Sequence, residues 1–226
     1  MSFRLFLPLI VVLAGCCKFE SGSEVDEAPA WEALFDGESL GSWEVTDYIA
    51  SRGAEVRDGV IVLKPGEPLG GIRWTGDPLP TVDYEIVLEA RRVEGDDFFC
   101  CLTFPYKETH ASFVIGGWGG SLTGISNVGG YDASENSTMS IGDFENGIWY
   151  KVRLRATGDR IEAWIGEDQY VNLTTTEKRI EMRFGEIEES VPLGISVFMT
   201  TSEVRNIRLE RLEAGAPAIA PGEDDF

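Results

Sequence analysis

Apolar and polar residues alternate with a period of two along most of residues 31–212, and no convincing helical period interrupts them. The clearest run is 84–91, where the even-numbered residues are apolar and Glu85, Glu89 and Arg91 share the other side. Successive side chains of a strand point to opposite faces, so this pattern predicts strands with one buried and one polar face. We therefore expect an all-β fold, a two-sheet antiparallel sandwich whose polar side lines an open concave surface.

Turn signals separate the predicted strands. Asp58-Gly59 between segments 55–57 and 60–64 predicts a type I′ hairpin, and a Thr-Gly-Asp turn joins 149–156 to 160–165. Segment 98–104 is apolar on both faces and is predicted to lie centrally in its sheet. Further strands are expected around 180–184, at 193–200 and at 203–212.

The charge balance excludes one class of partner. The 226 residues include 19 Lys and Arg against 39 Asp and Glu, a formal charge of -20. A nucleic-acid-binding protein needs a basic face, so no nucleic-acid partner is expected. His110 is the only histidine, which excludes a multi-histidine metal site and leaves one imidazole for proton transfer.

Residues 1–15 have the pattern of a bacterial lipoprotein signal peptide. Arg4 precedes the apolar run 5–13, and Leu-Ala-Gly-Cys ends at Cys16. The run is far shorter than the roughly 20 residues that span a bilayer. The pattern predicts a lipidated Cys16 that anchors the chain in the cell envelope, on the periplasmic or outer-membrane face. A secretory signal that happens to end in Gly-Cys is the alternative.

The remaining chain divides into three parts. Residues 16–30 carry the lipidated cysteine and a flexible acidic tether, and 31–212 form the jelly-roll domain. Residues 213–226 are expected to be a disordered acidic tail. Because so acidic a chain is repelled from anionic headgroups, the lipid anchor must hold it at the membrane.

Several motifs, in order, carry a family resemblance. They are Leu-Phe-Asp-Gly at 34–37, Asp-Tyr-Glu-Ile-Val-Leu-Glu-Ala-Arg at 83–91, Asn-Gly-Ile-Trp-Tyr-Lys-Val at 146–152 and Val-Arg-Asn-Ile-Arg-Leu at 204–209. Together they resemble the 3-keto-disaccharide hydrolase domain family, which implies a concanavalin A-like, laminin G-like jelly roll. Residues 106–145 hold a glycine-rich run instead of the polar strand, with Gln and Asp, typical of that family.

The resemblance implies hydrolysis of a 3-keto-glycoside. A base removes the C2 proton, which is α to the carbonyl, the anomeric group leaves, and water adds. Glu89 or His110 is the candidate base, and Arg73 or Arg91 the candidate stabiliser of the enolate. Two alternatives remain, a non-catalytic carbohydrate-binding surface lipoprotein and a purely structural envelope protein.

Aromatic and basic side chains are the candidate sugar contacts. Trp118 lies among four glycines, and an exposed indole there could stack on a sugar face. The full set of candidate binding residues is Trp74, Trp118, Trp164, Arg153, Arg205 and Asn206. Core packing explains most tryptophans equally well.

Charged groups on the predicted strands also have simpler interpretations. Glu89 and Arg91 could form cross-strand ion pairs on a solvated sheet face. The acidic loop 94–97 could hold a divalent cation such as calcium, although a solvated charge run is the commoner role. Cys100 and Cys101 point to opposite faces of a strand and are expected to be buried thiols rather than a disulfide. No cofactor is certain from the sequence.

Overall fold

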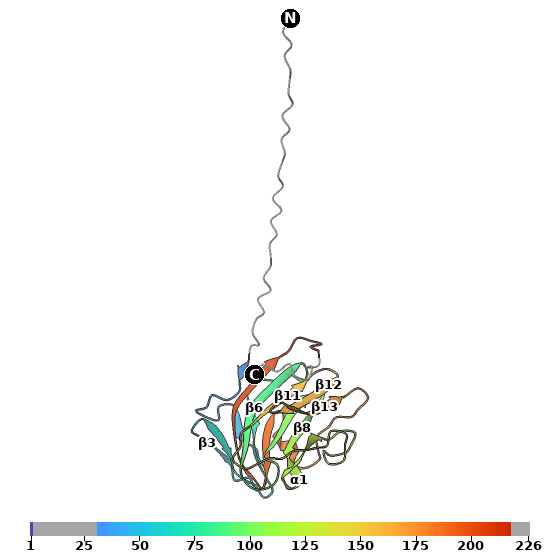
Figure 1. The fold of residues 1–226 in the computed structure, drawn as a ribbon. Helices are drawn as coiled ribbons and strands as arrows, with labels where there is room; N and C mark the ends of the chain where they lie inside the picture. Colours follow the sequence, from blue (N-terminus) through green and yellow to red (C-terminus); the bar gives the residue numbers. More distant parts are fainter. Residues whose placement is uncertain (2–30, 218–226) are drawn as a thin grey trace.

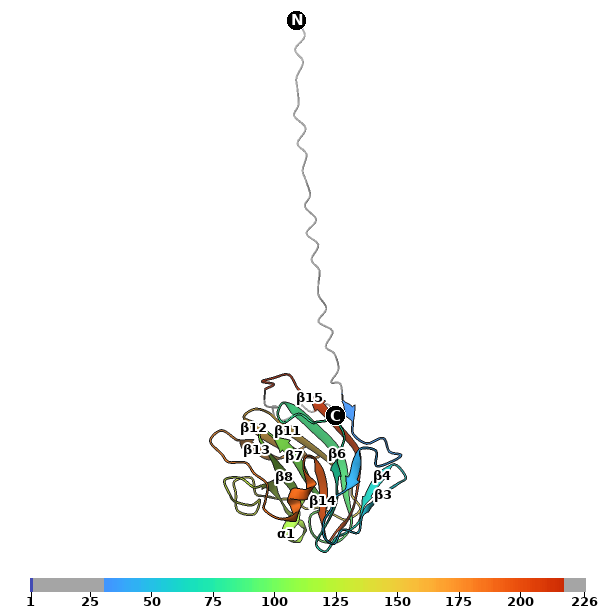
Figure 2. The same cartoon turned by 180° about the vertical axis from the view of Figure 1, so that it is seen from behind.

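The computed structural model describes Met1 and residues 31–217. Residues 31–217 build two antiparallel sheets that pack face to face (Figures 1 and 2). All of the predicted signal peptide except Met1, the whole of the predicted segment 16–30 with Cys16, and residues 218–226 of the predicted tail lie outside the described residues. In the described part of the chain, no helix is long and apolar enough to cross a membrane.

The eight-stranded sheet contains the two longest strands as neighbours. Its order is β13 (Asp168–Thr174), β12 (Arg160–Ile165), β11 (Tyr150–Ala156), β6 (Tyr84–Glu94), β15 (Thr201–Arg211), β4 (Val60–Leu63) and β3 (Ala54–Arg57). The short β1 (Glu32–Ala33) also pairs with β15. Strands β11 and β15 thus flank β6, and the outward-facing residues of these three strands lie side by side.

The seven-stranded sheet covers the other side of the core. Its order is β10 (Ser140–Ile141), β9 (Leu122–Ser126), β8 (Thr109–Gly116), β7 (Cys100–Tyr106), β14 (Gly194–Phe198), β5 (Leu69–Trp74) and β2 (Trp43–Val45). A single turn, α1 (Gly117–Gly120), follows β8 at one end of the molecule (Figure 1). The 3₁₀ helix η1 (Glu186–Ser190) precedes β14.

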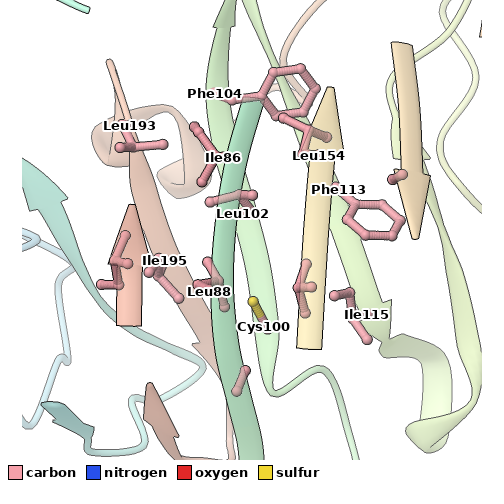
Figure 3. Close-up of a cluster of buried hydrophobic side chains, with 14 of the residues drawn as sticks. Ile86, Leu88, Cys100, Leu102, Phe104, Phe113, Ile115, Leu154, Leu193 and Ile195 are labelled. Carbon is pink, nitrogen blue, oxygen red and sulfur yellow. The ribbon is translucent and has the colours of Figure 1, made fainter. Parts of the chain in front are cut away.

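The core lies between the two sheets and is built from the apolar side of each strand. Ile86 and Leu88 of β6 meet Cys100 and Leu102 of β7 in this layer (Figure 3). These four side chains are almost completely buried. The period-two pattern of the sequence is therefore the pattern of a sheet that is buried on one face.

The main strand predictions are confirmed. Asp58 and Gly59 both have positive φ between β3 and β4, as a type I′ turn requires. Strand β7, which covers most of the predicted segment 98–104, pairs with β8 and β14 in the middle of its sheet. Among the described residues, Cys100 and Cys101 are free, buried thiols.

The prediction of a strand around 180–184 is wrong. Ile180 makes one isolated bridge to Val128, and Phe184 is exposed before the chain enters η1. This segment crosses the outer face of the seven-stranded sheet, where the sulfur of Met182 accepts a hydrogen bond from Ser112 Oγ. Its backbone bonds to the loop at Asn127 and Gly129, and Phe184 does not pack on the sheet, so the alternation does not mark a strand of either sheet.

Candidate functional site

The predicted site residues lie on opposite sides of the sandwich. Glu89 and Arg91, together with Arg153, Trp164 and Arg205, belong to strands of the eight-stranded sheet. Arg73, Trp74, His110 and Trp118 belong to the seven-stranded sheet or the turn that follows its strand β8. Since the core lies between the two sheets, these groups do not form one site.

Glu89 sits on the outer face of β6, opposite Lys151 of β11 and Arg205 of β15. Arg205 donates through Nε and one terminal nitrogen to Glu89 Oε2, at 2.9 and 2.7 Å. Asn206 Nδ2 donates to the other oxygen at 2.7 Å. Burial raises the pKa of Glu89, but the hydrogen bonds from Arg205 and Asn206 outweigh it, and the pKa is lowered overall.

A chain of ion pairs and stacked rings continues along this face from Glu89. Arg91 donates to Glu203 Oε2, and the guanidinium groups of Arg91 and Arg205 lie 4.6 and 4.1 Å from the ring centre of Trp149. Arg91 is therefore held by a carboxylate and an aromatic ring. The predicted cross-strand ion pairs are present here, and they occupy the groups proposed as base and stabiliser.

A buried ion-pair cluster on this face joins Glu85 to Arg153 and Arg155. Arg153 donates to both carboxylate oxygens of Glu85, at 2.8 and 2.9 Å, and Arg155 lies 3.4 Å from one of them. The Arg153 guanidinium also covers the ring of Trp164 at 4.9 Å. Trp164 is only 5% exposed, so its ring serves packing in this structure rather than an open sugar platform.

A cleft of about 350 Å³ opens on this face between the ion pairs. Its lining residues are Trp31, Val87, Leu88, Glu89, Lys151, Val152, Arg153, Gly166, Asn206 and Arg208. The hydrogen-bonding groups include one carboxylate and several N–H donors, while the side chains of Val87 and Trp31 supply apolar surface. Such a mixture of apolar lining and a few convergent polar groups is typical of small-ligand sites.

Sequence reasoning missed three important residues of this cleft, Trp31, Lys151 and Arg208. Lys151 follows from strand parity, because it is two residues from Arg153 on β11. Arg208 does not, because the pairing of β15 with β6 shifts between Arg205 and Arg208 around the positive-φ residue Asn206. This bulge turns Arg208 toward the side of the sheet that carries Arg205.

The candidates on the seven-stranded sheet are dispersed. Arg73 is bound to Glu44, and Trp74 packs edge-on against Trp43 in the core. His110 lies half-buried opposite Pro105, where burial lowers its pKa. Trp118 is 44% exposed with a left-handed φ of 50°, as the glycine-rich context predicts for an open indole.

Trp118 lines a second hollow, an apolar groove of about 270 Å³ on the outer face of the seven-stranded sheet. The tilted aromatic pair Phe98 and Phe198 forms one part of the groove, and Cys101 and Ser112 form another. Burial raises the pKa of the Cys101 thiol to about 12, which keeps it protonated at neutral pH. The Cys101 thiol of the groove is therefore not a nucleophile at neutral pH, and the charged groups that line the groove are Arg183 and Glu186.

Glu162 is a buried carboxylate outside both hollows. One oxygen accepts a hydrogen bond from Gln169 at 3.3 Å, and the other has no partner among the described residues. Burial raises its pKa, and the nearby Arg155 offsets part of that rise.

The acidic loop 94–97 precedes β7, and Asp97 is bound within the loop region. Asp97 accepts hydrogen bonds from the backbone amides of Phe98 and Gly119. In the described residues, no group of three or more His, Cys, Asp or Glu side chains lies close enough to hold a metal ion.

Comparison with solved structures places the fold among jelly-roll sandwiches. The endo-β-1,3(4)-glucanase SCLam of family GH16 superposes with a TM-score of 0.55 at 10% identity, covering 82% of this chain and 94% of that one. The Crh5 transglycosylase in complex with NAG gives 0.53 at 12% identity, with 84% and 86% covered. A native glycosidic hydrolase gives 0.52 at 10% identity, with 84% and 97% covered.

The family follows from the sequence match. The model of the 3-keto-alpha-glucoside-1,2-lyase-like domain matches residues 30–210, and the chain belongs to this family. The match confirms the family resemblance seen in the motifs, and it supports a carbohydrate-related function. No curated protein matches the chain.

Proposed function

We propose that this chain binds carbohydrate without catalysis, in the cleft on the eight-stranded sheet. The observation that carries the proposal is the composition of that cleft. Lys151, Asn206 and Arg208 offer donors, Glu89 offers a carboxylate, and Val87 gives an apolar floor. Sugars present hydroxyl groups at their edges and C–H groups on their faces, so they match a site of this kind.

The surroundings of Glu89 favour binding over catalysis. An effective general base has a pKa near the working pH and free electron pairs directed at the substrate. Both oxygens of Glu89 already accept hydrogen bonds, and its pKa is lowered. His110, the other candidate base, lies on the opposite sheet.

The second candidate is hydrolysis of a 3-keto-glycoside, which family membership favours. Glu89 would take the C2 proton, and the anomeric C–O bond would break with its electrons leaving on the oxygen, which takes a proton from water. The hydroxide would then add to C1 of the enone, and Glu89 would return its proton to C2. If this reaction occurs, Glu89→Gln should lower turnover by about 10²–10⁴ with little loss of binding. A wild-type protein that binds sugar and releases no product supports the binding proposal.

Two matched tryptophan variants test where sugar binds. Trp31→Ala removes an aromatic wall of the cleft, and Trp118→Ala makes the same chemical change on the opposite sheet. We expect Trp31→Ala to weaken binding in calorimetric titrations by about 1 kcal/mol, a several-fold rise in Kd, with Trp118→Ala unchanged. The reverse result would move the site to the groove, and a protein that binds no glycan in a broad array would contradict the proposal.

The lipid anchor remains part of the proposal. Lipidation of Cys16 would hold the domain in the cell envelope, where a surface sugar-binding protein meets its ligand. The Leu-Ala-Gly-Cys sequence that ends at Cys16 supports it.

A further inference from the structure

The cleft on the eight-stranded sheet is basic, although the whole chain is strongly acidic. The formal charge of the chain is -20. Three of the charged residues that line the cleft are cations, Lys151, Arg153 and Arg208, and the only carboxylate among its lining residues is Glu89. A small basic site on an acidic protein concentrates positive potential where a ligand would sit.

Glu89 does not neutralise this site, because its charge is already paired. It accepts two hydrogen bonds from Arg205, which is not itself a lining residue, and one from Asn206. Arg153 is likewise paired, through two hydrogen bonds to the buried Glu85. The charges of these paired residues offset one another within the sheet, so the other two cations determine the charge that a ligand meets.

Lys151 and Arg208 are the two remaining cations of the cleft, and Lys151 acts electrostatically on Glu89, which lies opposite it. Both are exposed, and in the described part of the chain neither forms an ion pair with a carboxylate. Arg208 lies over the ring of Trp31 at 5.7 Å, a contact that leaves its charge without a counterion.

The two cations stand on opposite sides of β6. Lys151 of β11 is opposite Glu89, and Arg208 of β15 is opposite Val87, two residues along the same strand. Two strand spacings and two residue rises put their Cα atoms about 12 Å apart, with the floor of the cleft between them. A sugar lying over Val87 would therefore have an ammonium on one side and a guanidinium on the other.

We propose that the cleft selects acidic carbohydrate, a sugar bearing a carboxylate or sulfate group, over the corresponding neutral sugar. This inference rests on the proposed binding function of the same cleft and adds its ligand class. Charge-assisted hydrogen bonds from lysine and arginine to such an anion are stronger than bonds to a neutral hydroxyl. A carboxylate and a sulfate share this chemistry, and the experiment distinguishes them.

The test uses the purified full chain and a panel of glycans in matched pairs. Each uronic-acid oligosaccharide is paired with its methyl ester, and each sulfated oligosaccharide with its unsulfated form. We expect the acidic member of at least one pair to bind tenfold more tightly or better. Its Kd should also rise steeply with salt, because the bond is electrostatic. The carboxylate and sulfate arms show which anion is preferred.

Two double variants decide whether the cations of the cleft are responsible. Lys151→Gln with Arg208→Gln removes both charges, while Lys107→Gln with Lys178→Gln removes two exposed charges outside the lining of the cleft. The first variant should lose the preference, so that the acidic and neutral members of a pair bind with equal Kd, and the second should keep the preference of the wild type.

The failures of the two proposals are distinguishable. Equal binding of acidic and neutral partners, or a preference that survives Lys151→Gln with Arg208→Gln, overturns this inference and leaves sugar binding intact. Absence of binding to every member of the panel overturns the binding proposal itself, and this inference with it.

Discussion

The outer faces of the two sheets accommodate their polar side chains in different ways. On the eight-stranded sheet, charged side chains are paired across strands, as in Glu85 with Arg153 and Glu89 with Arg205, and a polar cleft remains open. On the seven-stranded sheet, small neutral groups such as Thr103 and Ser196 are completely buried under other segments of the chain. A covered face can use small hydroxyls that bond to their cover, whereas an uncovered face carries charges and can meet a ligand.

The buried ion pair gives the largest expected effect. Glu85→Ala would remove the buried carboxylate that Arg153 and Arg155 share. Breaking such a pair costs about 3–5 kcal/mol, so the free energy of unfolding in urea should fall by that amount. The control is Glu89→Ala, which breaks a more exposed pair and should cost less than about 1 kcal/mol. Equal losses would show that depth does not distinguish the two pairs.

A substitution on the covered face of the seven-stranded sheet should lower the free energy of unfolding by a smaller amount. Tyr48 and Ser196 share a buried hydrogen bond of 2.6 Å beneath the cover of the seven-stranded sheet. Tyr48→Phe removes the hydroxyl and leaves Ser196 without this partner, so we expect a loss of about 1 kcal/mol in the same unfolding measurement. Sugar binding should not change, because the cleft lies on the other sheet. A loss of sugar affinity without a loss of stability would contradict this separation of roles.

The smallest effect is a pH dependence at Glu162. Burial raises its pKa above the ordinary 4.5, so the folded state favours the neutral carboxyl. The contribution of the neutral Glu162 carboxyl to the free energy of unfolding is complete below pH 4.5, and it is lost as pH rises through the pKa of Glu162 in the folded protein. Glu162→Gln should therefore be more stable than wild type at pH 7, with the gain shrinking toward pH 4. Denaturation curves at several pH values measure it, and a gain that grows on acidification would reverse the sign.

Glu89 should show the opposite dependence. Its pKa is lowered in the folded protein, so its ion pair stabilises above pH 4.5 and the benefit is lost as pH falls through the folded pKa. Glu89→Gln should thus cost stability at pH 7 and become neutral in acid. The same denaturation series compares both variants, and parallel curves would refute the different environments assigned to the two carboxylates.

The sequence predicted the sheets well because strand parity is a local property. The alternation along residues 84–91 placed Glu89 and Arg91 together on the polar side, as the structure confirms. Parity cannot tell which strands are neighbours or which sheet a strand joins. The sequence therefore offered Trp118 as a sugar contact together with Glu89, although Trp118 lies in the turn after β8 on the other sheet.

The cleft itself was harder to predict because it depends on long-range pairing and one irregularity. Trp31 lies beside Arg208 only because β1 pairs with β15, far along the chain. The bulge near Asn206 moves Arg208 out of simple alternation. The prediction of which tryptophans are exposed was limited for another reason. Trp74 and Trp118 are the same residue type, yet Trp74 packs in the core and Trp118 is exposed.

The central claim is that sugar binds to the uncovered face of the eight-stranded sheet. Amide chemical shifts of the isotope-labelled protein, recorded during titration with the glycan that binds best, test it directly. We predict that the perturbed amides cluster at Lys151, Gly166 and Asn206, around the cleft. Perturbations confined to Trp118 and Phe184, around the groove of the seven-stranded sheet, would contradict the account.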